Sequence, residues 1–175
     1  NKITNVSDPT SAQDAATKSY IESVVNSMNQ KKSVLAATTN NVAATYSGTN
    51  TLTLTATGVF TIDGITPNIN NRVLIKDQTN GFENGIYYVH TVGDTGVSCV
   101  LKRTDDADTA AKLAPGSFVF AERGATLDNI GFILTQNSTP DFTSVDNTFG
   151  QFTGASSISA GNGVSVSGDT ISVDA

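Results

Sequence analysis

Residues 51–55 read Thr51-Leu52-Thr53-Leu54-Thr55, and this strict alternation of polar and apolar side chains decides the fold class. A period of two places both leucines on one face of a strand, whereas a helix needs a period near 3.6. Further short apolar runs follow along the chain, each of a length typical of a strand. They are residues 72–76, 85–90, 98–102, 117–121 and 131–135.

Turn-forming residues separate these runs. They are Asp63-Gly64, Asn80-Gly81, Asn84-Gly85, Gly93-Asp94, Pro115-Gly116 and Thr139-Pro140-Asp141. Only residues 105–113 have a pattern that predicts a helical turn. Six or more strands at intervals of roughly 8–15 residues, without helices between them, predict an antiparallel β-sandwich or barrel domain over residues 34–153.

The composition fits a mainly β protein and excludes several functions. The chain has 175 residues, of which 25 Thr, 17 Ser and 16 Asn make up a third. A single Cys excludes an intramolecular disulfide and any Cys-based zinc site. A net charge of −6 argues against nucleic acid as a partner. No apolar stretch approaches the roughly 18–20 residues of a membrane span, so we expect no membrane insertion.

Residues 1–33 carry the one convincing helix, which we expect from Ser11 to Gln30. Asp8-Pro9, or Ser11 with Asp14, supplies the start signals. Ile21, Val24, Val25 and Met28 then recur at helical spacing. Two heptads do not distinguish a coiled-coil seam from an amphipathic helix that lies on its own domain, and periodicity alone leaves both interpretations open.

Residues 154–175 form a Gly/Ser-rich tail that predicts a β-hairpin. Val164 and Val166 alternate, Gly168-Asp169 turns the chain, and Ile171 and Val173 alternate again. An isolated two-stranded hairpin is only marginally stable in water. The helix stripe and the hairpin therefore both need a partner, and association of identical chains would supply it. The chain starts at Asn1 without a signal-peptide pattern, so we expect a fragment of a longer protein.

The sequence contains little that points to catalysis. It has no phosphate-binding, zinc-protease, nucleophile-elbow or EF-hand motif. His90 is the only histidine, so we interpret it as structural or exposed. Cys99 has the pattern of a small buried hydrophobe. Asp105, Asp106 and Asp108 form the densest acidic cluster; a weak Ca²⁺ site and turn capping are both open, and capping is favoured because the EF-hand Gly and Glu are absent. We predict no catalytic residue, no metal ligand and no cofactor.

The first 21 residues resemble a known family. Lys2–Ile21 (KITNVSDPTSAQDAATKSYI) is similar to a repeat of bacteriophage tail fibres, in which a short strand, an Asp-Pro turn and a DAATK-type helix form a trimeric shaft segment. The middle of the chain resembles a β-domain of such fibres, and the tail resembles a hairpin that follows it. The matching residues are 62–64, 72–78, 83–87, 103–108, 115–120, 160–164 and 167–173. Residues 66–71 depart from the turn usual before the strand at 72–76, which leaves the shape of that loop open.

The resemblance implies an elongated homotrimer with a coiled-coil-like helical segment at its N-terminal end. Its seam would be formed by Ile21, Val24, Val25 and Met28, and β-branched seam residues are compatible with trimers. The three β-domains would surround the axis, and the C-terminal strands would intertwine. Similar modules occur in phages, prophages and bacterial surface adhesins, so the expected location is a virion tail fibre or a cell-surface fibre.

The expected function is non-enzymatic attachment to a cell-surface glycan or protein receptor. Three weak sites on one rigid trimer would bind with increased avidity. The candidate binding loops are Asn80–Asn84, Asp105–Lys112 and Ser138–Asn147, although no residue in them identifies itself as a sugar ligand. Two alternatives stay open: a purely structural spacer of a longer fibre, and a depolymerase that cleaves surface polysaccharide.

Overall fold

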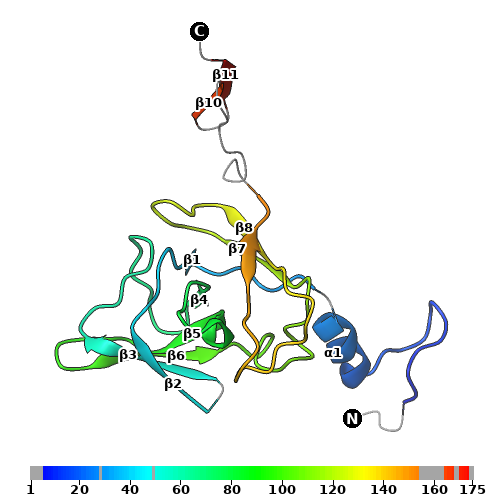
Figure 1. Cartoon of the computed structure of the whole chain (residues 1–175). Coiled ribbons are helices and arrows are strands. Elements are labelled where there is room, and N and C mark those ends of the chain that lie inside the picture. Colours follow the sequence, from blue (N-terminus) through cyan, green and yellow to red (C-terminus); the bar gives the residue numbers. More distant parts are fainter. Residues whose placement is uncertain (1–5, 28, 49, 154–163, 168–169, 174–175) are drawn as a thin grey trace.

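The computed structural model describes residues 6–27, 29–48, 50–153, 164–167 and 170–173, and it confirms a mainly β chain (Figure 1). All six apolar runs form strands. The elements are α1 (Lys18–Ser27), β1 (Ala36–Ala37), β2 (Ala44–Ser47), β3 (Thr51–Thr57), β4 (Arg72–Ile75), the 3₁₀ turn η1 (Gly81–Glu83), β5 (Gly85–Thr91), β6 (Ser98–Arg103), β7 (Phe118–Ala121), β8 (Ile130–Leu134), β9 (Phe149–Gln151), β10 (Val164–Ser167) and β11 (Thr170–Val173).

The largest sheet has six strands in the order β1-β4-β5-β6-β3-β2. Its centre is antiparallel, with Arg72 opposite Tyr88 between β4 and β5, and Tyr88 opposite Lys102 between β5 and β6. A second sheet contains β7, β8 and β9 in antiparallel order. Strands β1, β2 and β9 were not expected, because their sequences, Ala-Ala, Ala-Thr-Tyr-Ser and Phe-Gly-Gln, contain no apolar run of the kind seen in the other strands.

The segment from Asn29 to Thr38 joins the two sheets. Its first part runs parallel to β7, where the Lys31 amide donates to the Phe118 carbonyl and the Val34 amide to the Phe120 carbonyl. Its second part, β1, runs parallel to β4. The prediction of a purely antiparallel domain therefore needs correction here. A strand that changes sheets is a known way to form a corner between two packed sheets.

Apolar side chains fill both faces of the six-stranded sheet. Successive side chains on a strand point to opposite faces. Leu74 and Ile86 pack toward the second sheet, against Val119 and Phe132. The alternate residues of the same strands pack on the other face, in a cluster with Phe60 and Ile62 from the loop after β3. Its strand members include Val73, Ile75, Tyr87, Val89 and Leu101.

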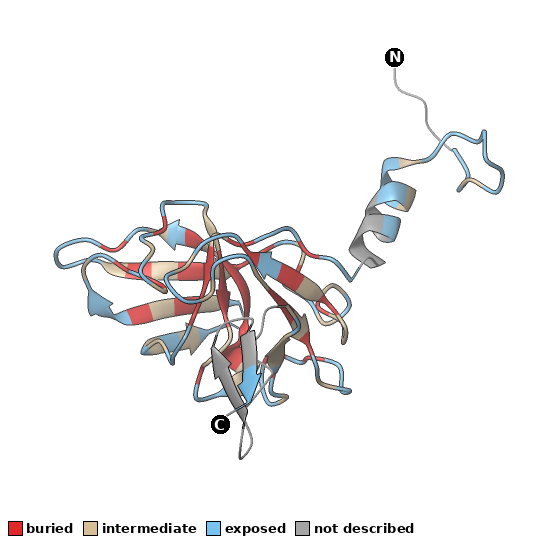
Figure 2. Cartoon of the chain, turned by 90° about the horizontal axis from the view of Figure 1, so that it is seen from above, coloured by how far each residue is buried: buried red, intermediate tan, exposed pale blue. Residues whose placement is uncertain are grey.

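The helix is shorter than expected, because it begins at Lys18 rather than Ser11 and ends at Ser27. The Asp14 carboxylate accepts the backbone amides of Thr10 and Ser11 at 2.8 Å, which closes a local turn. Side-chain bonds of this kind compete with helix formation. The real N-cap is Thr17, whose hydroxyl accepts the Tyr20 amide at 3.0 Å. Both views show α1 standing clear of the β-body (Figures 1 and 2).

One turn prediction needs correction, at Asn84-Gly85. Residues 105–113 contain the predicted helical turn: the Leu113 amide donates to the carbonyl of Thr109, four residues earlier, at 2.9 Å, and the turn does not extend into a helix. Asn84-Gly85 is extended, because Asn84 is buried and leads directly into β5. Asp63-Gly64 is a tight turn as predicted, with φ of 46° and 77°.

The C-terminal hairpin is confirmed within the part of the tail that is described. β10 and β11 pair antiparallel, with Val164 opposite Val173 and Ser167 opposite Thr170. Residues 154–163 lie outside the described part of the chain, as does the turn at Gly168-Asp169. Among the described residues, no helix has the length and apolar character needed to cross a bilayer.

Candidate functional site: a pocket beside Tyr88

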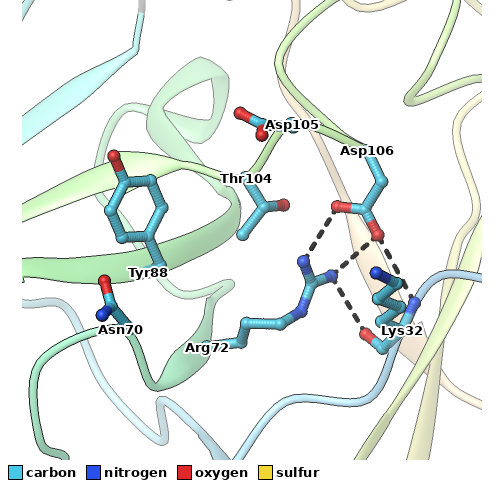
Figure 3. A pocket seen from close by; sticks show the side chains of 7 residues that line it. All are labelled: Lys32, Asn70, Arg72, Tyr88, Thr104, Asp105 and Asp106. Atoms are coloured by element: carbon cyan, nitrogen blue, oxygen red, sulfur yellow. Dashed lines mark hydrogen bonds and ion pairs between the residues drawn. The ribbon is translucent and has the colours of Figure 1, made fainter.

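A pocket of about 340 Å³ opens where one face of the six-stranded sheet emerges from under the loop that follows β6 (Figure 3). It joins five parts of the chain: the segment before β1, the turn before β4, the start of β4, strand β5 and the start of the loop after β6. Its lining residues are Lys32, Asn70, Arg72, Tyr88, Thr104, Asp105 and Asp106.

One wall of the pocket is an ion pair between β4 and the loop after β6. The Arg72 guanidinium donates to both carboxylate oxygens of Asp106, at 3.0 and 2.9 Å. It also donates to the carbonyls of Lys32 and Ser33, at 3.0 and 3.2 Å. A bidentate pair of this kind is geometrically specific. Arg72 thus links the sheet, the loop after β6 and the segment before β1, so this wall of the pocket stabilises the fold.

The ionisation of Asp106 supports this structural role. Burial alone would raise the pKa of Asp106, but hydrogen bonds from Arg72 and Thr104, the Arg72 charge and the Lys32 amide together hold it below its ordinary value. Asp106 is therefore ionised at neutral pH. A group held in this state does not supply a proton, so it is unsuited to act as a general acid.

The opposite wall consists of side chains whose hydrogen-bonding groups are not used within the described part of the chain. They are the Tyr88 hydroxyl, the Asn70 amide and the Asp105 carboxylate. In Figure 3 the Tyr88 ring shows its face, with Asn70 beside it, Asp105 beyond Thr104, and the Arg72–Asp106 pair across the cavity. An aromatic face next to open donors and acceptors is a typical arrangement for binding a small polar ligand.

Asn70 reaches this wall because of a turn before β4. The Asn71 side chain accepts the Asn68 amide at 2.8 Å, and the Asn71 amide donates back to the Asn68 carbonyl at 3.0 Å. Asn70 then adopts a left-handed backbone with φ of 66°, which asparagine tolerates better than most residues. The backbone amide of Asn70 donates to the Val89 carbonyl at 2.8 Å, which fixes the turn against β5 and leaves the side-chain amide unused within the described residues. This is the segment, residues 66–71, whose shape the sequence left open.

Two of the three candidate loops, Asn80–Asn84 and Ser138–Asn147, are joined by a buried network. The Asn84 side-chain amide donates to the Asn147 carbonyl, and the Asn147 side-chain amide donates to the carbonyls of Phe82 and Asn84, all at 3.0 to 3.1 Å. Asn84 and Asn147 are 5% and 0% exposed. These asparagines fix the shape of the loops, so they are not available to a ligand.

Arg103 is the centre of this network. It is 3% exposed and donates to the carbonyls of Phe82 and Asn84 and to the Tyr46 hydroxyl, at 2.9 to 3.2 Å. Its guanidinium lies 4.0 Å from the centre of the Phe142 ring. Cation–π contact and hydrogen bonds compensate the burial of its charge. The sequence did not predict this role of Arg103, which appeared there only as the first residue of the matching stretch 103–108.

The third candidate loop, Asp105–Lys112, supplies two lining residues of the pocket, but its acids do not converge. Asp106 pairs with Arg72, Asp108 accepts from the Lys112 ammonium at 2.8 Å, and Asp105 is exposed. Among the described residues no three His, Cys, Asp or Glu side chains gather as a metal site would require. The weak Ca²⁺ site is therefore not supported: Asp106 links the loop to β4, and Asp108 pairs within the loop.

The single histidine and the single cysteine have the positions expected of them. His90 is exposed on β5, and its ring meets the Tyr88 ring edge-on at 6.2 Å between centroids. Cys99 is 1% exposed, and burial raises the pKa of its thiol. A buried thiol with a raised pKa is unreactive.

The predicted trimer seam is described only in part. Ile21 and Val24 expose 50% and 44% of their surface on α1. The side chain of Val25 and the whole of Met28 lie outside the described residues. The interface residues therefore stay a prediction.

Comparisons with known proteins do not add to this picture. No family model, no curated protein and no solved structure matches the chain. The resemblance to tail fibres therefore stays a prediction from the sequence.

Proposed function

We propose that the chain is a segment of a trimeric, non-enzymatic fibre that attaches a phage or a bacterium to a glycan on the surface of a host or prey cell. The observation that carries the proposal is the pocket beside Tyr88. It combines an aromatic ring with an amide and a carboxylate that have no hydrogen-bonding partner in the described chain. These are the groups with which proteins bind polyhydroxylated ligands.

The exposed apolar residues of α1 support assembly into a fibre. α1 stands clear of the β-body, and Ile21 and Val24 are exposed on it (Figures 1 and 2). Burial of such residues against copies of the same helix is favourable. A trimer would carry three identical pockets on one axis, and simultaneous binding would raise the avidity of a weak site.

A glycan array tests the attachment function. We expect the 175-residue chain to bind a subset of surface glycans, and the signal to fall when the protein is diluted below the concentration at which it associates. An array without any bound glycan, together with no binding to intact bacterial cells, would contradict the proposal.

A structural spacer is the second candidate, and one observation favours it. The loops Asn80–Asn84 and Ser138–Asn147, which would be natural binding loops, use their side chains to hold each other through Arg103 and two buried asparagines. Binding by a longer fibre but not by this chain would favour the spacer.

Hydrolysis of a surface polysaccharide ranks behind binding. Glycosidases need one carboxyl with a raised pKa to act as the general acid. In the pocket, Arg72 instead helps to lower the pKa of Asp106. Release of oligosaccharides from purified surface polysaccharide, and its loss in Asp105→Asn, would establish hydrolysis instead.

A further inference from the structure

We propose that the pocket beside Tyr88 holds one uncharged sugar residue, which stacks on the Tyr88 ring and donates hydroxyl hydrogens to Asp105. This proposal rests on the attachment function above and specifies its ligand class. It assigns the binding contacts to Tyr88, Asn70 and Asp105. The Arg72–Asp106 pair acts as the rigid support.

Tyr88 supplies the apolar part of the site. Pairing with Arg72 on one side and Lys102 on the other fixes its backbone on β5, and its ring meets the His90 ring edge-on. An aromatic face carries partial negative charge, which attracts the slightly positive C–H groups on one face of a sugar ring. Its hydroxyl remains available to a polar substituent.

Asp105 determines which polar groups the ligand must carry. An ionised carboxylate only accepts hydrogen bonds, and Asp105 is exposed and has no donor in the described part of the chain. A ligand with several adjacent hydroxyl groups supplies such donors. Asn70 complements Asp105, because its amide both donates and accepts.

The charges around the pocket favour an uncharged sugar over an acidic one. The Arg72 guanidinium is neutralised by Asp106 and also donates to two backbone carbonyls, so it is engaged before a ligand arrives. An acidic sugar would face the Asp105 carboxylate in a chain of net charge −6. Lys32 also lines the pocket and balances the charge of Asp105, so the lining as a whole carries no net charge, which suits an uncharged ligand.

Ligand-detected NMR on the 175-residue chain tests the proposal. The probes are glucose, galactose, mannose and N-acetylglucosamine, with glucuronic acid and sialic acid as charged counterparts. Three variants alter the contacts: Tyr88→Thr removes the ring but suits a strand, Asp105→Asn removes the charge, and Asn70→Gly removes the amide but keeps the left-handed backbone. Asn129→Gly and Asp128→Asn are matched controls, because Asn129 is another exposed asparagine with positive φ, 57°, and Asp128 is an exposed acid outside the pocket.

We expect at least one uncharged sugar to bind. Affinity should fall at least about tenfold in Asp105→Asn and about 3- to 10-fold in Asn70→Gly, with no change in the controls. Tyr88→Thr should abolish detectable binding. Circular dichroism and thermal unfolding of each variant establish that the fold is retained.

Three results would overturn the proposal. Binding of an uncharged sugar that survives Tyr88→Thr would place the site elsewhere, with the attachment function intact. Binding of acidic sugars alone, lost in Lys32→Gln, would overturn the ligand class. Absence of binding by every probe would also overturn it, and only the glycan array and cell assay decide whether the attachment function fails as well.

Discussion

At the scale of single residues, the buried Arg103 carries a charge that the fold has to compensate. Its guanidinium holds the carbonyls of Phe82 and Asn84 and contacts the Phe142 ring. Arg103→Met keeps most of the volume but removes the hydrogen bonds and the cation–π contact. Disruption of a buried charged group costs several kcal/mol, so we expect a loss of about 3–5 kcal/mol in the free energy of unfolding, measured in urea at fixed protein concentration.

Lys102→Met is the matched control for Arg103→Met. Lys102 is the preceding residue of β6 and its side chain is partly exposed on the opposite face, so its loss should change stability by less than about 1 kcal/mol. Equal effects of the two substitutions would contradict a central role for Arg103.

The Arg72–Asp106 pair makes stability depend on pH in a defined direction. The pKa of Asp106 is lower in the folded chain than in the unfolded chain. Its ionised form therefore stabilises the fold above about pH 4, and this contribution disappears as the pH falls through the lowered pKa. We expect Asp106→Asn to cost about 1–2 kcal/mol at pH 7, since one partner of a bidentate pair is removed.

The test compares the unfolding free energy of the parent chain and of Asp106→Asn between pH 7 and pH 3. The difference between the two should shrink toward the acid end. Asp105→Asn, which removes a neighbouring carboxylate without hydrogen bonds in the described chain, should give a small difference throughout. A difference for Asp106→Asn that is constant with pH would contradict the assignment.

At the scale of elements, the sequence predicts the strands whose residues follow a periodic pattern. It misses the elements and boundaries that depend on contacts with other parts of the chain. A run such as Thr51–Thr55 forms a strand because its alternation matches one buried face, at Leu52 and Leu54, and one face of half-buried or exposed threonines. β1 has two residues and no period, and it exists because Leu35 and Thr38 donate to carbonyls of β4. The helix start was misplaced because Asp14 forms its own turn.

The candidate site was likewise predicted only in part. The loop Asp105–Lys112 was predicted, and it contributes Asp105 and Asp106 to the pocket. Tyr88 and Asn70 were not singled out, because only the pairing of β4 with β5 and the turn before β4 bring them together. One signal was available: Tyr88 and His90 flank the apolar Val89, so both place polar groups on the face of the strand opposite Val89. Polar-tipped residues on one phase indicate a face that meets solvent.

At the scale of the whole molecule, the arrangement of α1 predicts association of identical chains. A ten-residue helix that stands clear of its domain is short for independent stability, since isolated helices below about 12–15 residues are marginal in water. Its exposed Ile21 and Val24 would be buried in a helical bundle. Light scattering should therefore give about 54 kDa, three times the 18.1 kDa of the chain.

Substitutions on α1 decide whether this helix forms the contact. Asparagine at both Ile21 and Val24 would place polar groups in an apolar seam, so the double variant should scatter as a single chain, whereas Ser19→Asn, at an exposed position of the same helix, should remain trimeric. A parent chain of 18.1 kDa would contradict the trimer itself. A trimeric double variant would instead exclude α1 as the main seam. The contact would then have to lie on the C-terminal strands or on the β-body, where Phe120 and Phe152 are 37% and 48% exposed and stack edge-on, 5.7 Å apart.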